Sequence, residues 1–394
     1  MANVSSSNGL EKRPKLRFPG FDEPYKQCRI GDIYAERSQR GASDMELLSV
    51  TMNDGVKPRS EIEGKDNSSE DKSNYKIVRK GDMVYNSMRM WQGANGISPC
   101  DGIVSPAYTV LMPKQEINNG YFAALFKSVT LINEFRKNSQ GMTSDTWNLK
   151  YPQIETIKVQ IPSVSEQDKV SELFSVLDER IATQAQLVES LKKYKRGVNN
   201  QILSQIDNSY NCRLGSVCEI VGGGTPDTLH TEYWGNTVEW FTPSEIGKTK
   251  YVNNSVRKLS DIGLDNSSAK LLPIGTVLLT TRATLGEMSI AKRECSTNQG
   301  FQSLIPHTDR VSSEYLYYMQ IIIKPWCEKY ASGNTFREIS KSALSDCIIP
   351  IPDRARQEQI VKLLSSIDLI IGGAESISMS LSKIRHGLMQ QLFI

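Results

Sequence analysis

The chain carries one segment twice, and this repeat constrains its architecture more than any other feature. Residues 161–203 and 351–393 align without a gap at a constant offset of 351 − 161 = 190. Most apolar positions that differ exchange one aliphatic residue for another, and twelve positions are identical: Ile161/Ile351, Pro162/Pro352, Gln167/Gln357, Leu173/Leu363, Ser175/Ser365, Asp178/Asp368, Ile181/Ile371, Ser190/Ser380, Leu191/Leu381, Lys193/Lys383, Gly197/Gly387 and Gln201/Gln391. A period this long excludes a solenoid of short units and indicates a duplicated domain.

Each copy has the spacing of a long amphipathic helix that follows an Ile-Pro step. Read in steps of four and three residues, the copies give two series: Val170, Phe174, Leu177, Ile181, Gln184, Val188, Leu191, Lys195, Val198, Ile202, and Ile360, Leu364, Ile367, Ile371, Ala374, Ser378, Leu381, Arg385, Leu388, Leu392. An average spacing of 3.5 residues is the coiled-coil signature, and about 38 residues make a rod of roughly 55 Å. We expect two long helices that pair as an antiparallel coiled coil through these residues.

Two basic residues occupy the same place in the two series, Lys195 in the first copy and Arg385 in the second. A polar residue at such a position sets register or oligomeric state. The sequence leaves two roles open for this pair. They either control register or form ion pairs with the opposite helix or a partner protein.

The segments upstream of the two helices are also related, with small gaps. Residues 28–33 match 212–217, and residues 81–86 match 275–280. The segments 81–86 and 275–280 each have the pattern of a turn glycine followed by a half-buried strand. Further strands are expected at 109–113 and 303–306, helices at 121–137 and 314–331, and long polar surface loops at 55–76 and 248–270. The predicted fold is α+β, with four parts: a first mixed domain (1–160), a long helical segment (161–206), a second mixed domain (207–350) and a second helical segment (351–394).

Composition excludes several classes of protein. The seven cysteines are scattered without a CxxC pair and only three histidines occur, so neither a disulfide framework nor a zinc site is indicated, and we expect no metal or other cofactor. The N-terminus has no apolar signal region, and the most apolar stretch, 315–326, is too short to span a bilayer, so we expect a cytoplasmic protein without a membrane partner. A net charge of +3 gives a nucleic-acid partner only weak support, which must come from local basic clusters.

One loose pattern points to catalysis. Asp227, Glu245 and Lys248 follow the acid, acid, lysine order of a metal-dependent nuclease, in which two carboxylates hold Mg²⁺. A self-sufficient nuclease is therefore one alternative, although the first copy has no counterpart and short motifs often occur by chance. A coiled-coil scaffold that joins proteins without touching DNA is another.

Several segments together resemble one family. PKLRFPGF (14–21), GGGTPDTLHTEYWGNTVEWFTPSEI (222–246), LLTTRATLG (278–286), TNQGFQSLIP (297–306), SGNTFREISKSAL (332–344) and the two long helices resemble the DNA-specificity (S) subunit of type I restriction-modification enzymes. The resemblance implies a non-catalytic subunit with two target-recognition domains, each binding one half of a split double-stranded DNA target. It also implies that the helices set the spacing and dock two modification (methyltransferase) subunits, and that restriction subunits supply ATP-driven translocation and cleavage.

Base readout needs side chains that hydrogen-bond to base edges, and phosphate contacts need basic groups or backbone donors. In the second domain the predicted DNA-binding residues are Thr225, Thr242, Ser244, Lys248, Arg282, Asn298, Gln299 and Arg337. In the first domain, aligned positions and the flanking loop give Asn86, Arg89, Trp91, Gln92, Ser105 and Thr143. For each of these residues the alternative is a structural role, such as capping a turn. The predicted helix-pairing and partner residues are Leu177, Ile181, Leu191, Lys195, Ile367, Ile371, Leu381 and Arg385.

Overall fold

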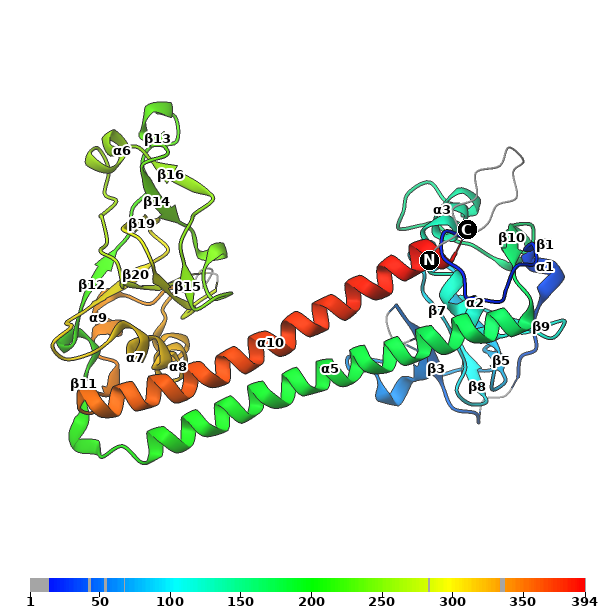
Figure 1. Ribbon diagram of the computed structural model, residues 1–394, viewed down its shortest axis with the longest axis horizontal. Coiled ribbons are helices and arrows are strands. Elements are labelled where there is room, and N and C mark those ends of the chain that lie inside the picture. The colour runs from blue at the N-terminus through cyan, green and yellow to red at the C-terminus, as the bar shows by residue number, and fades with distance from the viewer. Residues whose placement is uncertain are drawn as a thin grey trace. The chain divides into compact units, whose positions relative to one another are not determined.

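The computed structural model describes residues 14–41, 44–52, 55–66, 68–282, 284–333 and 337–393. The chain divides into two compact units: unit 1 is Met1–Gln186 with Glu375–Ile394, and unit 2 is Leu187–Ala374. Each unit contains a domain of mixed strands and short helices together with a stretch of each long helix (Figure 1). The predicted α+β class, with two mixed domains and two long helices, is confirmed.

The long helices are α5 (Val164–Ser204) and α10 (Arg354–Leu392). Every position of the two predicted four-three series is buried or half-buried, whereas positions between them, such as Glu179 and Arg196, are exposed. The helix α10 runs without a break through Gly372 and Gly373, although glycine is a poor helix former. Packing of the two apolar stripes against each other therefore stabilises these helices more than the helix propensity of their residues does.

Contacts within each unit show that the two helices run antiparallel. In unit 1 the Arg385 guanidinium pairs with both carboxylate oxygens of Asp178, and the Phe174 ring stacks on Phe393 at 5.6 Å. In unit 2 Lys195 pairs with Asp368. Asp178 and Asp368 are equivalent under the repeat, and so are Lys195 and Arg385, so the duplication produces the same ion pair twice. The basic residues thus pair with the opposite helix.

A buried glutamine fixes the start of each long helix. The Gln167 amide donates to the Pro162 carbonyl at 3.0 Å, and its oxygen accepts the Asn118 backbone N–H at 3.0 Å. Gln357 repeats this arrangement with Pro352 and Ser312, at 2.9 and 3.1 Å. Asn118 and Ser312 are the N-cap residues of α2 (Asn119–Leu125) and α7 (Ser313–Tyr318). Each glutamine therefore joins its long helix to its mixed domain.

An antiparallel sheet of order β2-β9-β6-β7 forms the centre of unit 1. Met83 and Tyr85 on one face pack against the short helices, while Val84 on the other face packs against the paired strands β3–β4 and β5–β8. The elements are α1 (Ile30–Ile33), β2 (Tyr34–Glu36), β3 (Leu48–Thr51), β4 (Gly55–Pro58), β5 (Lys76–Val78), β6 (Met83–Asn86), β7 (Asn95–Ile97), β8 (Gly102–Val104), β9 (Tyr108–Pro113), α2, α3 (Val129–Asn138) and α4 (Tyr151–Ile154). The pair β1 (Lys26–Arg29) and β10 (Lys158–Ile161) leads into α5.

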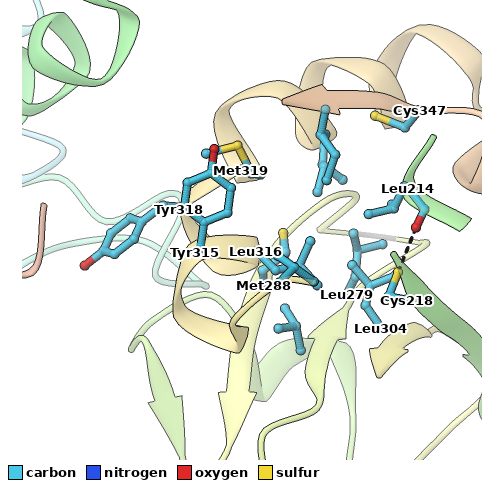
Figure 2. Close-up of a cluster of buried hydrophobic side chains, with 14 of the residues drawn as sticks. Leu214, Cys218, Leu279, Met288, Leu304, Tyr315, Leu316, Tyr318, Met319 and Cys347 are labelled. Atoms are coloured by element: carbon cyan, nitrogen blue, oxygen red, sulfur yellow. Dashed lines mark hydrogen bonds between the residues drawn. The ribbon is translucent and has the colours of Figure 1, made fainter. Parts of the chain in front are cut away.

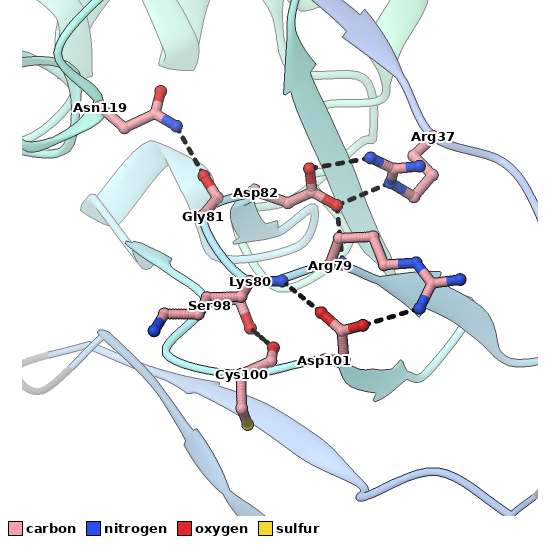
Figure 3. A network of polar contacts seen from close by, with 9 residues as sticks. All are labelled: Arg37, Arg79, Lys80, Gly81, Asp82, Ser98, Cys100, Asp101 and Asn119. Carbon is pink, nitrogen blue, oxygen red and sulfur yellow. Dashed lines mark hydrogen bonds and ion pairs between the residues drawn. The ribbon is translucent and has the colours of Figure 1, made fainter.

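A polar network holds the turn that starts β6 (Figure 3). Buried Asp82 accepts Arg37 at 2.6 Å and the Arg79 backbone N–H at 2.8 Å. Asn119 of α2 donates to the carbonyl of Gly81, which has φ 91° and so adopts a conformation that favours glycine. The network fixes β6, whose far end carries Asn86.

Unit 2 contains two larger sheets, of order β12-β20-β17-β18-β15 and β13-β16-β14-β19. Leu279, Met288 and Leu304 of the first sheet pack against Leu316 and Met319 in the core shown in Figure 2. The elements are β12 (Cys218–Gly222), β13 (Trp234–Gly235), β14 (Val238–Phe241), β15 (Tyr251–Val252), β16 (Arg257–Leu259), α6 (Asp261–Asp265), β17 (Val277–Leu279), β18 (Met288–Ala291), β19 (Cys295–Thr297), β20 (Gln302–Pro306), α7, α8 (Gln320–Tyr330) and α9 (Lys341–Ser345). The pair β11 (Asn211–Arg213) and β21 (Ile348–Pro350) leads into α10.

The prediction of long surface loops at 55–76 and 248–270 is wrong in part. The first segment contains β4, where Val56 is buried, and the second contains β15, β16 and α6, where Val252 and Leu259 are buried. Among the residues that the structure describes, no helix combines the length and apolar character that a bilayer-crossing helix needs.

Candidate nucleic-acid interface

Five strand ends meet at one edge of unit 2. The strands β14 and β19 are parallel, so their carboxyl ends lie at the same edge, where the Asn298 N–H donates to the Phe241 carbonyl. The strand β20 runs antiparallel to β12 and β17, so its start lies beside their ends. The loops that leave these strands form the polar edge of unit 2, which consists of Thr225, Thr242, Ser244, Arg282, Asn298 and Gln299.

Close backbone packing explains the glycines of this edge. A Cβ atom on Gly223 would lie 2.0 Å from the carbonyl oxygen of Asn298, so only glycine fits there. The approach places Thr225 beside Gln299, whose side-chain oxygen accepts the Thr225 hydroxyl. The Asn298 side-chain oxygen accepts the Gly300 N–H at 2.9 Å. Since both amide oxygens are used, the NH₂ groups are the donors available for acceptors on base edges.

Thr242 is held by a carboxylate. Its backbone N–H and its hydroxyl both donate to Glu245 Oε2, at 2.8 and 2.7 Å, and the other Glu245 oxygen accepts the Val256 N–H. Thr242 therefore caps the short helix 243–245, a structural role, while neighbouring Ser244 remains exposed.

An acidic residue that the sequence analysis missed shapes the same edge. Glu338 lies 3.0 Å from the Arg282 guanidinium and accepts the Thr281 hydroxyl. Its backbone pairs with that of Ser332, and Arg337 donates to the Glu328 carbonyl. Only its position beside Arg337 in the sequence hinted at this role. A carboxylate here orients Arg282 and can itself accept a base amino group.

Lys248 lies beyond this group. It is exposed and follows Gly247, whose N–H donates to Ser289 on the hairpin after β17. Within the described ranges no acceptor contacts the Lys248 ammonium group. An exposed lysine next to a polar edge is suited to a phosphate contact rather than to base readout.

Unit 1 builds the same edge with different side chains. The Ser87 N–H donates to the Ala107 carbonyl at 3.2 Å, as the Thr281 N–H donates to Gly300 at 2.8 Å in unit 2. The corresponding loops form the polar edge of unit 1, which consists of Asn86, Arg89, Trp91, Gln92 and Ser105. Asn86 caps its turn by accepting the Met88 N–H, and Arg89 is exposed.

Trp91 has a packing role. Its ring lies 5.2 Å from Trp147 and 5.3 Å from the Arg136 guanidinium, and its indole N–H donates to the Met88 carbonyl. Neither Trp147 nor Arg136 lies in a motif that aligns between the two copies, so the sequence alone does not point to them. Thr143 lies at the exposed tip of the loop that contains Trp147 and is hydrogen-bonded to Thr146, so it flanks the polar edge.

The sequence profile described as "Type I restriction modification DNA specificity domain" matches residues 23–193 and 207–376, which is most of the chain. The chain belongs to this family. The two matched regions correspond to the two copies of the repeat, so each copy is one specificity domain with its own polar edge.

Curated relatives of this specificity-domain chain include two type I specificity subunits. The MjaIX specificity subunit of Methanocaldococcus jannaschii is 34% identical over 186 residues, which is 46% of this chain and 43% of that protein. The EcoR124I/EcoR124II specificity subunit of Escherichia coli is 26% identical over 259 residues, 61% of each chain. The alignments therefore span between about two fifths and three fifths of these relatives.

Solved structures share the fold over nearly the whole length. A chain from a structure on the complex assembly and conformational transition of the type I R-M system aligns with a TM-score of 0.62 at 18% identity, covering 96% of this chain and 99% of that one. The S subunit of the M. genitalium type I system aligns with a TM-score of 0.57 at 14% identity, covering 97% and 99%.

In this specificity-domain fold, the two carboxylates of the nuclease alternative have structural partners. Asp227 accepts the Leu229 N–H at 2.9 Å, and both oxygens of Glu245 bind donors that cap or support loops. The nuclease alternative thus has no support from the geometry of its own residues.

Burial raises the pKa of Cys218, Cys295, Cys327 and Cys347 to about 12, so these thiols are protonated at neutral pH.

The long helices carry a second apolar series outside their contact. On α10 it consists of Leu363, Ile370, Ile377 and Ile384, seven residues apart and each about half exposed. The equivalent positions on α5 are Leu173, Arg180, Leu187 and Tyr194; Leu173 packs against the core of unit 1, and the charged Arg180 is exposed, as are Leu187 and Tyr194. We call these residues the outer series. Positions beside a coiled-coil seam are usually charged, so an exposed apolar row is unusual there.

Proposed function

We propose that this chain is the DNA sequence-recognition subunit of a type I restriction-modification complex, and that each polar edge binds one half of a split double-stranded target. One observation carries the proposal: the same strand-end frame holds different polar side chains in the two units. The matching hydrogen bonds of Ser87 in unit 1 and Thr281 in unit 2 align the two units, so Asn86 is equivalent to Thr280 and Ser105 is equivalent to Asn298. A shared frame with different contact groups suits two unlike half-sites.

Basic residues on these edges supply the attraction to the DNA backbone. Arg89 in unit 1 and Lys248 in unit 2 are exposed, and Arg282 is partly exposed beside Glu338. Neutralised phosphates release counterions, so the affinity of the complex for DNA should fall steeply as salt rises. Replacing Arg89 or Lys248 with alanine should lower the salt dependence by about one released ion each while preserving half-site preference.

We propose further that the long helices set the spacing between the half-sites and dock two modification subunits. The outer series supports docking, because it leaves an apolar row exposed on α10, and Leu187 and Tyr194 exposed on α5, beside a main stripe that is already paired. The duplication supports the docking of two modification subunits, because equivalent surfaces bind equivalent partners. In this assembly, which operates in the cytoplasm, methyl transfer from S-adenosylmethionine is the work of the modification subunits, and ATP-driven translocation and cleavage that of the restriction subunits.

Methylation mapping tests the recognition role. The chain is co-expressed with its modification subunit in cells that lack other adenine methyltransferases, and methylated adenines are mapped genome-wide. We expect one motif made of two short half-sites with a fixed gap. If no new methylated motif appears although both proteins are soluble and associated, DNA recognition by this chain is refuted.

Two adjacent substitutions test the docking role. Ile377 belongs to the outer series, and Ser376 is an exposed polar neighbour on the same helix. We expect Ile377→Glu to weaken copurification of the modification subunit at least tenfold, because a charge enters an apolar contact, while Ser376→Glu leaves it unchanged. Equal effects of the two variants, or none, would rule out the outer series as the docking surface.

A further inference from the structure

Lys250 occupies an aromatic site just beyond the polar edge of unit 2. Its ammonium nitrogen lies 4.5 Å from the centre of the Tyr318 ring, 5.3 Å from that of Tyr251 and 5.8 Å from that of Tyr317. It donates to the Tyr318 hydroxyl at 3.2 Å and to the Ser365 hydroxyl on α10 at 3.1 Å. Two residues earlier, Lys248 is exposed and belongs to the loop beside the polar edge. Lys250 therefore connects that loop to a long helix.

The contacts continue to the other long helix. The Tyr318 hydroxyl donates to Asp368 of α10 at 2.8 Å, and Asp368 pairs with Lys195 of α5. The Lys195 ammonium also lies 5.3 Å from the Tyr318 ring centre. One continuous set of contacts thus joins the loop at 248–250, the domain helix α7 and both long helices.

The backbone of the loop is fixed at the same point. The Lys250 carbonyl accepts the Ile290 N–H at 2.7 Å, and the Thr249 carbonyl accepts the Ser289 hydroxyl at 2.7 Å. Ser289 also accepts the Gly247 N–H. A shift of Lys250 relative to α10 would therefore move the loop and the hairpin beside it together.

Among the residues of unit 1 that the structure describes, the aromatic part of this connection is not repeated. The N-caps Asn118 and Ser312 align α2 with α7, so Ala123 and Ala124 stand where unit 2 has Tyr317 and Tyr318. Within the described chain, Asp178, the counterpart of Asp368, forms its polar contacts with Arg385. The ion pair between the helices is thus common to both units, whereas the aromatic site is an addition of unit 2.

We propose that Lys250 is a positioning residue, which fixes the polar edge of unit 2 to the paired helices and so makes the gap between the half-sites strict. This inference rests on the proposed function. A lysine amid three rings and two hydroxyl groups is held by cation–π attraction and directional hydrogen bonds together. Without it, the loop keeps its strand contacts but loses its attachment to α10.

The test measures methylation by the complete methyltransferase on DNA duplexes that carry both half-sites with the native gap or a gap one base pair shorter or longer. We expect Lys250→Met to lower the preference for the native gap roughly tenfold, the effect of losing about 1.4 kcal/mol, which is close to the lower end of the range for one hydrogen bond to a charged group. The bases preferred in each half-site should stay the same. A Tyr318→Phe variant keeps the ring but removes the link to Asp368, and should have an effect of the same kind.

Lys248→Met is the matched control, because it makes the same chemical change two residues away at an exposed position. It should lower methylation equally at all three gaps. If Lys250→Met also acts equally at all gaps, or has no effect, the positioning role is refuted. If Lys250→Met does not fold, as shown by its melting curve, Tyr318→Phe decides by the same criterion. Methylation of the native duplex by the unaltered complex shows separately that the proposed function holds.

Discussion

The paired helices can be lengthened without breaking either ion pair, and this gives a direct test of the proposed spacing role. Asp178 and Lys195 are 17 residues apart on α5, and Asp368 and Arg385 are 17 residues apart on α10. We would insert the heptad IATQAQL after Leu187 in α5 and after Ile377 in α10. A whole heptad keeps the buried stripe in phase, and this sequence avoids duplicating Gly372 and Gly373.

Seven residues add about 10.5 Å of helix at 1.5 Å per residue. At about 3.4 Å per base pair, the gap in the methylated motif should lengthen by at most about three base pairs, and by less where the helices are inclined to the DNA. Genome-wide methylation mapping reads the gap and both half-sites in one experiment. An unchanged gap, or altered bases in either half-site, would refute the spacing role.

The matched control inserts the heptad in α5 alone. The two helices then differ in length by one heptad, so the Asp178–Arg385 and Lys195–Asp368 pairs cannot both form in their present register. We expect a lower melting temperature and no sharp motif. A single insertion that behaves like the double one would show that pairing of the helices does not determine the gap.

Three further predictions concern stability. Arg17→Ala should cost about 3–5 kcal/mol in urea unfolding, because among the described residues it leaves the buried Glu166 carboxylate with only Tyr25 as a side-chain partner, and a loss below about 1 kcal/mol would contradict this. Gly372→Ala with Gly373→Ala should stabilise α10 by up to about 1 kcal/mol each, since both positions are helical and open, and a lower melting temperature would show that the glycines are needed there. Burial alone would raise the pKa of Glu239, but hydrogen bonds from Lys258 and Ser255 lower it below its usual value. The stability that Glu239 contributes is therefore fully present above its pKa in the unfolded chain and is lost as pH falls through its lower pKa in the folded protein. Glu239→Gln should flatten the acid side of a plot of melting temperature against pH, and an unchanged slope would oppose this.

Local periodicity was enough to predict the long helices but not the smaller strands. The buried stripe of α5 and α10 repeats over ten positions, so it stands out from the sequence. The strands β15 and β16 have only two and three residues, with one buried aliphatic residue each, Val252 and Leu259. Alternation cannot be recognised in so short a run, and the surrounding polar residues made the segment look like a loop.

The residues of the candidate interface were predictable to the extent that they lie in motifs. Thr225, Asn298 and Gln299 were inferred from segments that the structure brings to one edge. Glu338 and Trp147 were missed because their partners, Arg282 and Trp91, lie 56 residues away in the sequence, since 338 − 282 and 147 − 91 both equal 56. No local pattern encodes a contact of that kind. Thr242 has a capping role that the sequence did not reveal, because a capping threonine has the same residue type as a base-contacting one.

The equivalence of the two interhelical ion pairs has an evolutionary consequence. Each pair joins the aspartate of one copy to the base of the other, so recombination that overwrites one helix segment with its duplicate restores a matching partner every time. Under the proposed function, the same event in the mixed domains would give both polar edges the same side chains and so make both half-sites alike. The helices therefore tolerate homogenisation between the copies, while the domains retain their difference only if selection acts against it.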